Sequence, residues 1–303
     1  MIVLWDVSNL AHRVYHTTFH QDVGGEPCGI TYGFLKTAAR VTMSLKEMYM
    51  EPQFRIAVQD FGRCMWRTEA YPEYKQKRKK PSADDFLPQM DRLEAVLPAF
   101  GFTMSKVFGT EADDLIGVYS NEFSQKTSDT VVIVSSDRDL WQLIDDRVLI
   151  YDLQSHRIVN KELAEEEFGF PISRIVEYKA LAGDSSDNIP GARGVGEVLA
   201  RKIMAEWDVL DLVEKIEQKV IDINSQPTGI KKVAADTASV RLAGKLCTVA
   251  RECEDLFTKE AQDHARSIVD KVLTGHAEPM DYSAISLHKS LLQADENWEQ
   301  DFE

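Results

Sequence analysis

Acidic residues stand where the predicted buried strands of this chain end. The apolar runs at residues 2–5, 54–58 and 130–134 are each followed within three positions by an aspartate. Further acidic groups open a predicted helix near residue 111 and follow another near residue 182. The complete set is Asp6, Asp60, Glu111, Asp113, Asp114, Asp137, Asp139, Asp184 and Asp187.

This set predicts metal-dependent phosphodiester chemistry. Each acid alone is explained by a helix cap or a turn, where aspartate is common. A cluster is different, because like charges about 4 Å apart repel by ~4 kcal/mol at an effective dielectric of ~20. Such a cluster requires cations or raised pKa values. Oxygen ligands favour Mg²⁺ or Mn²⁺ over zinc, and two ions about 4 Å apart can hold the attacking and leaving oxygens of a phosphoryl centre.

A parallel sheet is the element that would gather these acids. The three apolar runs are rich in β-branched residues, as strands covered on both faces are. Helical patterns at residues 30–50 and 86–100 lie between them. Strands that alternate with helices predict a doubly wound parallel sheet, in which ligands bind outside the carboxyl ends of the strands. We therefore expect the acids to meet at one crevice.

The chain changes character near residue 171. Helical patterns at residues 172–181 and 196–207 flank a turn rich in Gly, Pro and Asp, and residues 224–231 have the composition of a turn or linker. We therefore expect an α/β core at residues 1–170 and a helical region at residues 171–290. Residues 291–303, which are rich in acids, are predicted to form a solvated tail.

A basic segment, defined here as residues 71–81, stands between the second strand and the helix that begins near residue 86. It carries five positive charges, at Lys75, Lys77, Arg78, Lys79 and Lys80, beside Tyr71 and Tyr74. A charge run of this kind is often a solvated loop. Cations beside aromatic faces, however, are also how proteins bind single-stranded nucleic acid. Above a carboxylate crevice, such a segment suits an anionic polymer as substrate.

Composition restricts the class of protein. The 303 residues carry 50 acidic and 35 basic side chains, a net charge of −15, and 44% hydrophobic residues, as in an ordinary globular protein. No apolar run reaches the ~20 residues of a membrane span, and the N-terminus does not resemble a signal peptide. The four cysteines show no zinc-ligand spacing, which favours reduced thiols in the cytoplasm.

The motifs occur in an order that resembles the 5′-nuclease superfamily, which includes flap endonucleases, phage 5′–3′ exonucleases and the 5′-nuclease domain of bacterial DNA polymerase I. The resemblance covers about residues 1–220. It rests on Asp6, Tyr74-Lys75-x-x-Arg78, Glu111-Ala-Asp113-Asp114, Ser136-Asp137-Arg138-Asp139 and the turn at residues 183–196, Gly-Asp-Ser-Ser-Asp-Asn-Ile-Pro-Gly-Ala-Arg-Gly-Val-Gly.

The resemblance implies a fold and a set of residue roles. The fold is a PIN-like parallel-sheet nuclease core with a basic helical arch at about residues 70–100 and a helix-hairpin-helix element at residues 172–207. Asp6, Asp60, Glu111 and Asp113 would hold one Mg²⁺, Asp137, Asp139, Asp184 and Asp187 would surround a second, and Asp114 would stand behind them. Mn²⁺ could replace Mg²⁺. Lys75 and Arg78 would contact the scissile phosphate, and Tyr74 would stack on a terminal base. The remaining implied DNA contacts are Arg13, Arg67, Arg193, Gly194, Gly196 and Lys202, with K⁺ at the hairpin turn.

The implied activity is a structure-specific 5′ nuclease of DNA replication or repair, acting as a monomer on DNA with a free 5′ end, a flap or a branch. Two alternatives remain open. One is a ribonuclease that removes RNA primers from RNA–DNA hybrids. The other is a non-catalytic module that binds branched DNA.

Overall fold

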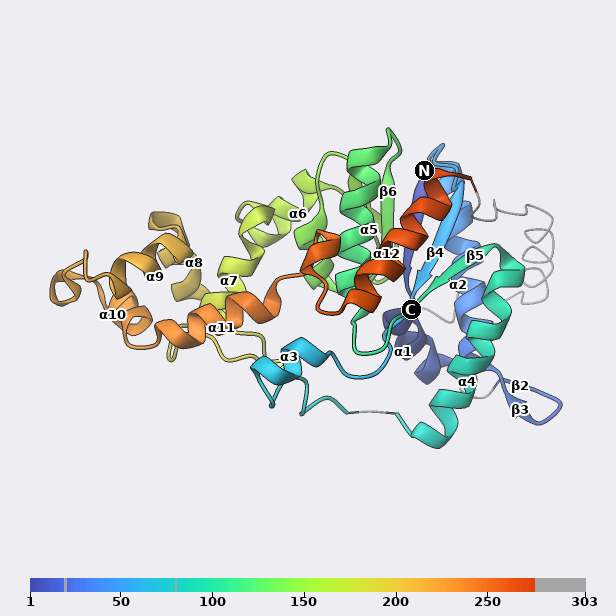
Figure 1. Ribbon diagram of the computed structural model, residues 1–303, viewed down its shortest axis with the longest axis horizontal. Helices are drawn as coiled ribbons and strands as arrows, with labels where there is room; N and C mark the ends of the chain where they lie inside the picture. The colour runs from blue at the N-terminus through green and yellow to red at the C-terminus, as the bar shows by residue number, and fades with distance from the viewer. Residues whose placement is uncertain (19–20, 80, 276–303) are drawn as a thin grey trace. The chain divides into compact units, whose positions relative to one another are not determined.

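The computed structural model describes residues 1–18, 21–79 and 81–275, which form two compact units (Figure 1). Among the described residues, the first unit, called the sheet unit, comprises residues 1–63, 81–161 and 250–275. The second, called the helical unit, comprises Cys64–Lys79 and Glu162–Val249. The expected tail at residues 291–303 lies outside the described residues.

A six-stranded sheet with the order β5-β4-β1-β6-β7-β8 forms the centre of the sheet unit. Its first five strands are parallel and β8 is antiparallel to β7, which confirms the predicted parallel sheet. The strands are β1 (Ile2–Asp6), β4 (Phe54–Val58), β5 (Phe102–Ser105), β6 (Val131–Ser135), β7 (Val148–Asp152) and β8 (Arg157–Val159); β2 (Asp22–Val23) and β3 (Glu26–Pro27) form a separate hairpin.

Helices cover both faces of this sheet (Figure 1). Val3 and Trp5 of β1 join a buried apolar cluster with one group of helices, and the Trp5 ring centroid lies 5.8 Å from that of Phe34. Ile2 and Leu4 alternate with them and point to the opposite face, where α5 packs on β1 and α12 packs on α5. The first group is α1 (Val7–Thr17), α2 (Gly29–Glu47), α4 (Ala83–Val96) and η1 (Leu97–Phe100); the second is α5 (Ala112–Lys126) and α12 (Lys259–Leu273), with short turns η2 (Arg138–Leu143) and η5 (Cys253–Asp255).

The helical unit has its own apolar core, which includes Leu181, Ile203, Leu212 and Val240. Its helices are α3 (Met65–Ala70), α6 (Lys161–Phe168), α7 (Ile175–Ala182), α8 (Glu197–Glu206), α9 (Val209–Glu217), α10 (Thr228–Ala234) and α11 (Thr237–Cys247), with η3 (Ile172–Arg174) and η4 (Ile223–Ser225).

The interpretation of residues 224–231 as a turn or linker is wrong in its second half, because α10 begins at Thr228. Pro227 immediately precedes the helix, where a proline does not interrupt helical hydrogen bonds. Gly229 allows α10 to approach α8 closely, since a Cβ there would lie 3.0 Å from the Leu199 side chain. This packing is a long-range effect that the polar composition of the segment does not reveal.

The two units divide the chain differently from the expected boundaries. Residues 64–79 group with the helical unit instead of the core, because Trp66, Tyr71 and Tyr74 pack against a cluster that contains Leu246. Residues 250–275 belong to the sheet unit again, where α12 buries Ala261, Ala265 and Ile268. No helix of the described residues is long and apolar enough to cross a membrane.

Candidate metal centre and nucleic-acid interface

Asp6 is held at the junction of β1 and α1. Its side chain is 4% exposed, and one carboxylate oxygen caps α1 by accepting from the Asn9 amide at 3.0 Å. The other oxygen accepts from the Ser135 hydroxyl at 2.8 Å, at the end of the neighbouring strand β6. Burial, with the nearby negative charges of Asp60 and Asp137, raises the pKa of Asp6 to about 7. An ionised Asp6 is therefore unfavourable in this position unless a cation is close.

Asp60 connects the end of β4 with the start of α5. Its carboxylate accepts from the backbone amide of Ala112 at 2.7 Å, and its own amide donates to the Ser8 hydroxyl at 2.9 Å. The N-terminus of a helix attracts negative charge, which accounts for the exposed carboxylate at this position. Asp60 and the acids of α5 are thereby brought to the same edge of the sheet.

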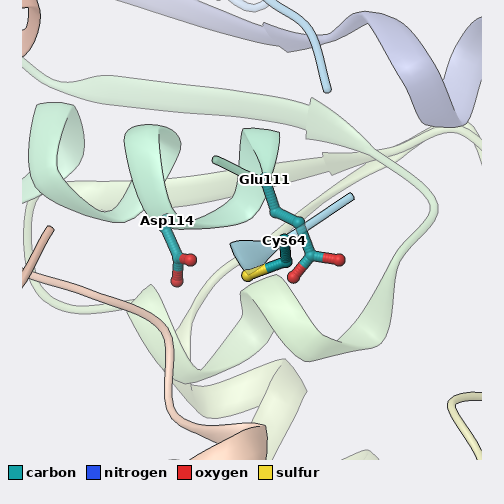
Figure 2. A group of neighbouring side chains, drawn as sticks. All are labelled: Cys64, Glu111 and Asp114. Carbon is teal, nitrogen blue, oxygen red and sulfur yellow. The ribbon is translucent and has the colours of Figure 1, made fainter. Parts of the chain in front are cut away.

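The N-cap and the first turn of α5 supply three more acids. Glu111 is 7% exposed and Asp114 is 3% exposed, and Figure 2 shows both carboxylates on the same side of the helix. Their i, i+3 spacing produces this arrangement, and a ligand oxygen of one lies within 4.8 Å of a ligand oxygen of the other. Asp114 also accepts from the Ala250 amide at 3.2 Å, while Asp113 is half-buried beside it.

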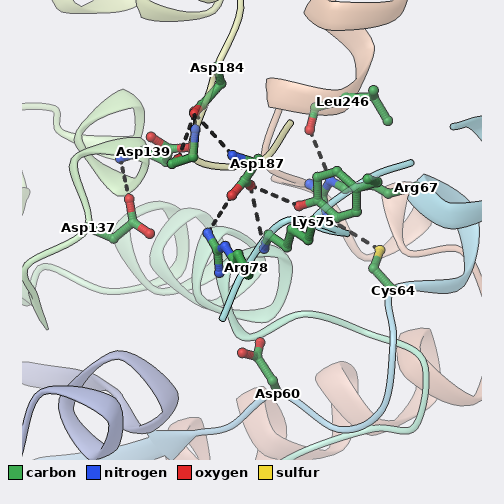
Figure 3. Close-up of polar contacts among 12 residues, drawn as sticks. Asp60, Cys64, Arg67, Lys75, Arg78, Asp137, Asp139, Asp184, Asp187 and Leu246 are labelled. Atoms are coloured by element: carbon green, nitrogen blue, oxygen red, sulfur yellow. Dashed lines mark hydrogen bonds and ion pairs between the residues drawn. The ribbon is translucent and has the colours of Figure 1, made fainter. Parts of the chain in front are cut away.

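Asp137 and Asp139 follow β6. Asp137 caps η2 and accepts from the Asp139 amide at 2.9 Å (Figure 3). The Asp137 amide donates to the Ser135 hydroxyl at 3.0 Å, and that same hydroxyl donates to Asp6. The structure thus gathers the predicted acids of the sheet unit around the carboxyl ends of β1, β4 and β6.

Asp184 lies in the turn of the helical unit, between α7 and α8. Its carboxylate accepts from the Lys179 ammonium at 2.7 Å and from the Ser186 hydroxyl and amide at 2.6 and 2.9 Å. Burial alone would raise the pKa of Asp184, but the Lys179 charge and these hydrogen bonds outweigh it and lower the pKa to about 2. Asp184 is therefore ionised and already has a cationic partner.

Asp187, in the same turn, is 6% exposed and contacts the basic segment (Figure 3). One carboxylate oxygen accepts from Arg78, and the other accepts from the Tyr74 hydroxyl at 3.2 Å and lies 3.6 Å from the Lys75 ammonium. The two predicted catalytic cations and the predicted stacking aromatic thus converge on this aspartate.

The turn that carries these aspartates closes through two glycines. Gly183 has φ +78°, and a Cβ there would lie 2.5 Å from the Gly191 amide nitrogen. A Cβ on Gly191 would in turn lie 2.3 Å from the Gly183 nitrogen. Only glycine at both positions permits this close approach, which sets the path of the turn from α7 to α8.

The predicted duplex contacts lie mostly on the surface. Arg193, Gly194, Gly196 and Lys202 are exposed residues of the turn and α8, and Arg13 is half-buried on α1. Gly194, at φ +77°, directs its carbonyl toward Lys232, whose ammonium donates to it at 2.6 Å.

Arg67, one of the expected DNA contacts, is buried and bonded to the backbone. Its side chain is 2% exposed, and its guanidinium donates to the carbonyls of Leu246 and Thr248 at 3.0 Å each (Figure 3). The last carbonyls of a helix have no partner within the helix, and Arg67 satisfies them at the end of α11. The resemblance to the 5′-nuclease superfamily implied a DNA contact at Arg67, whereas its partners in the structure are backbone groups far away in the sequence.

Family models of 5′-3′ exonucleases match most of the chain. The N-terminal resolvase-like domain matches residues 1–169, and the C-terminal SAM fold matches residues 170–268. The chain belongs to the 5′-3′ exonuclease family. This confirms the resemblance inferred from the motifs.

Relatives and solved structures agree with this family. A 5′-3′ exonuclease of Bacillus subtilis is 31% identical over 83% of this chain and 85% of its own length. The thermostable DNA polymerase I of Thermus thermophilus is 32% identical over 82% of this chain, and the match spans 28% of that protein. The phage T5 5′-exonuclease, in a structure with bound zinc, superposes with a TM-score of 0.73 at 21% identity, over 90% of this chain and 98% of its own. This last likeness establishes the fold.

The motifs of the 5′-3′ exonuclease family do not identify several residues that position this site. Ser135 joins Asp6 to Asp137, and Lys179 neutralises Asp184. Asn9 accepts from the Ser136 amide and hydroxyl at 3.1 and 2.7 Å and so connects α1 to the end of β6. The signal in the sequence was that two polar residues, Ser8 and Asn9, follow Asp6 within three positions.

Proposed function

We propose that this member of the 5′-3′ exonuclease family is a metal-dependent, structure-specific 5′ nuclease that acts on DNA as an exonuclease and a flap endonuclease. The observation that carries the proposal is the gathering of acids at the carboxyl ends of β1, β4 and β6 around a buried Asp6. Hydrolysis would leave a 5′-phosphate and a 3′-hydroxyl, as required in DNA replication or repair.

The acids of the sheet unit fit divalent metal ions. Asp6 is ionised only at a cost unless a cation is near, and the donors around it are oxygen atoms, which Mg²⁺ and Mn²⁺ prefer. The residues that would hold metal here are Asp6, Asp60, Glu111, Asp113, Asp114, Asp137 and Asp139. When bound, Mg²⁺ would lower the pKa of a water and neutralise charge on the phosphodiester. The resemblance also implies metal binding by Asp184 and Asp187, and this remains a prediction. Both carboxylates already have cationic partners, with which a metal ion would have to compete.

The basic residues of the helical unit provide the phosphate contacts. Lys75 and Arg78 would stabilise the charge that develops on the scissile phosphate. Arg193 and Lys202 would bind duplex phosphates, and the amides at the start of α8 after Gly196 suit an anion. Such contacts position a duplex without reading its sequence.

The expected K⁺ ion does not fit the Gly194 carbonyl. Lys232 donates to this oxygen at 2.6 Å, so the chain supplies its own cation at that atom. The Arg193 amide is held at the same time by Asp236, at 3.0 Å. We therefore propose that α10 and the start of α11 support the turn without a K⁺ ion at Gly194.

Cleavage of a 5′-labelled flap duplex and of a matching RNA–DNA hybrid tests the proposed function. Each substrate is incubated with Mg²⁺, with Mn²⁺ and with EDTA. We expect release of the DNA flap near the junction with either metal and no cleavage in EDTA. Cleavage of the hybrid alone would identify a primer-removing ribonuclease. Binding without cleavage of either substrate would leave a branched-DNA binding module.

A further inference from the structure

Two phenylalanines are exposed beside the acids of the sheet unit. Phe61 directly follows Asp60 and is 43% exposed, and Phe108, three positions before Glu111, is 59% exposed. Their ring centroids lie 5.5 Å apart in an edge-to-face arrangement, with an angle of 83° between the ring planes. A single exposed apolar side chain is common on a protein surface, whereas neighbouring exposed rings form an apolar patch, the feature that marks binding sites.

The backbone holds these two rings in place. The chain after β4 runs beside the chain after β5, and the Gly109 amide donates to the Phe61 carbonyl at 2.6 Å. The Phe108 ring packs over Gly62, since a Cβ on that glycine would lie 2.9 Å from a ring carbon. Val107 is buried and ties the second loop to the protein interior. The rings are therefore already ordered, and a ligand that contacts them would not have to order them.

Cations stand next to the ring pair. The Lys106 ammonium lies 4.8 Å from the centroid of the Phe61 ring and also pairs with Glu94. Arg63, two positions after Phe61, is exposed. The net charge of the chain is −15, so cations beside exposed rings do not follow from its composition. Aromatic faces next to Lys and Arg are the means by which proteins bind single-stranded nucleic acid.

The position of the rings selects the ligand. Phe61 shares its loop with Asp60, whose carboxylate bonds to the Ala112 amide, and Phe108 shares its loop with Glu111. Neighbouring Cα atoms are about 3.8 Å apart, and a DNA strand rises by about 3.4 Å per nucleotide. A phosphate bound at these acids therefore has the rings within about two nucleotides of it along its own strand.

We propose that Phe61 and Phe108 form a stacking platform for a nucleobase of the strand that is cleaved, close to the scissile phosphate. Every base has a π-face, so the platform requires a base without reading its identity. A base inside a duplex is already stacked on both faces, so the platform selects an unpaired or terminal nucleotide. This inference rests on the proposed function for its substrate and adds a base-binding site to it.

Fluorescence of 2-aminopurine tests the platform without cleavage. The analogue is placed in a flap DNA, one oligonucleotide at a time, at the two nucleotides on either side of the junction, and each DNA is titrated with protein in EDTA. Stacking on a ring quenches the emission. At saturating protein, emission from at least one position should therefore be lower with the wild type than with Phe61→Leu or Phe108→Leu. Both variants keep an apolar side chain without a ring and should bind the flap about tenfold more weakly.

Two further variants separate the ring from other effects of substitution. Phe108→Trp keeps an aromatic face and should preserve the quenching and the affinity. Tyr49→Leu is the matched control, because Tyr49 is 97% exposed in the same unit but lies before β4, at the opposite end of this strand from Phe61. It should bind and quench like the wild type.

An abasic nucleotide at the quenched position provides a second test, now by cleavage in Mg²⁺. The wild type should lose about tenfold in kcat/KM, because the base that stacks is missing. Phe108→Leu should lose nothing further on this substrate, since the partner of that base is already absent.

Two results would overturn the inference. One is emission and affinity that are equal in the wild type and in both leucine variants, at unchanged melting temperatures. The other is an equal loss on the abasic substrate in the wild type and in Phe108→Leu. Failure of the proposed function is a different result, because flap cleavage would be absent in Mg²⁺ while the quenching in EDTA still depended on the rings.

Discussion

The two groups of acids in this chain balance their charge in different ways. In the sheet unit, Asp6 is buried near Asp60 and Asp137 and receives hydrogen bonds from neutral groups, the Asn9 amide and the Ser135 hydroxyl. In the helical unit, Asp184 pairs with Lys179, and Asp187 pairs with Lys75 and Arg78.

The difference indicates which group is prepared for an external cation. Carboxylates that repel one another in a folded protein store unfavourable energy, which a bound cation can relieve. Carboxylates with Lys or Arg partners have little such energy to relieve, and breaking the pair leaves a charge without compensation. We therefore expect that removing an acid from the sheet unit abolishes activity but raises stability. Removing an acid from the helical unit should instead lower stability.

The largest effect is expected for Asp137→Ala. Flap cleavage in Mg²⁺ should fall by about 10³-fold or more, as when a preorganised group that stabilises the transition state is lost. Flap binding, measured by fluorescence anisotropy in EDTA, should persist, because an acid near DNA contributes mainly repulsion. Asp145→Ala is the control, since Asp145 also accepts backbone amides in a turn of the sheet unit but lies before β7. If Asp137→Ala cleaves the flap as fast as an active Asp145→Ala, Asp137 is not part of the catalytic site.

Arg67→Met and Arg193→Met, both in the helical unit, are expected to have opposite effects: the first on stability and the second on DNA binding. Arg67→Met should destabilise the protein by about 1–3 kcal/mol, because the buried Leu246 carbonyl loses its donor; the Thr248 carbonyl, on an exposed residue, also loses its donor but can bond to water. Its DNA affinity should change little while it is folded. Arg193→Met should leave the melting temperature unchanged and reduce the salt dependence of DNA binding by about one phosphate contact. Loss of affinity in Arg67→Met without loss of stability would support the expected DNA contact of Arg67.

Replacing one acid in each unit by asparagine, in EDTA, tests the proposed difference between the units most directly. Asp6→Asn should raise the free energy of unfolding by about 0.5–2 kcal/mol, the range for relief of a strained functional site, while cleavage is lost. Asp184→Asn should lower it, because Lys179 loses its partner. Thermal unfolding of both variants in EDTA provides the measurement. If both shift the melting temperature in the same direction, the proposed difference between the units is wrong.

The smallest effect is expected for Lys232→Gln. Wild-type affinity for duplex DNA should be equal in K⁺ and Na⁺ at one ionic strength, because Lys232 supplies the cation at Gly194. The variant should bind about 0.5–1 kcal/mol more weakly, the scale of a partly exposed ionic contact. A K⁺ requirement in the wild type would contradict the assignment of Lys232.

Much of the sheet unit could be predicted from the sequence. The β-branched runs before Asp6, Asp60 and Asp137 predicted strands, and parallel pairing places their carboxyl ends at one edge of the sheet. The acids of α5 follow from a local rule as well, because an i, i+3 spacing places Glu111 and Asp114 on one face of a helix. These features depend on continuous apolar runs and on the 3.6-residue period of a helix, which a sequence displays directly.

What the sequence determined by itself was the family, the parallel sheet and the identity of the acids that end its strands. Tertiary structure decided which charges meet. Arg67 contacts a carbonyl 179 positions away, and Arg78 contacts Asp187 across 109 positions. A basic residue has the same local signature whether it faces a phosphate, a helix terminus or an aspartate. Its role is fixed only when the folded chain determines which oxygen atoms surround it.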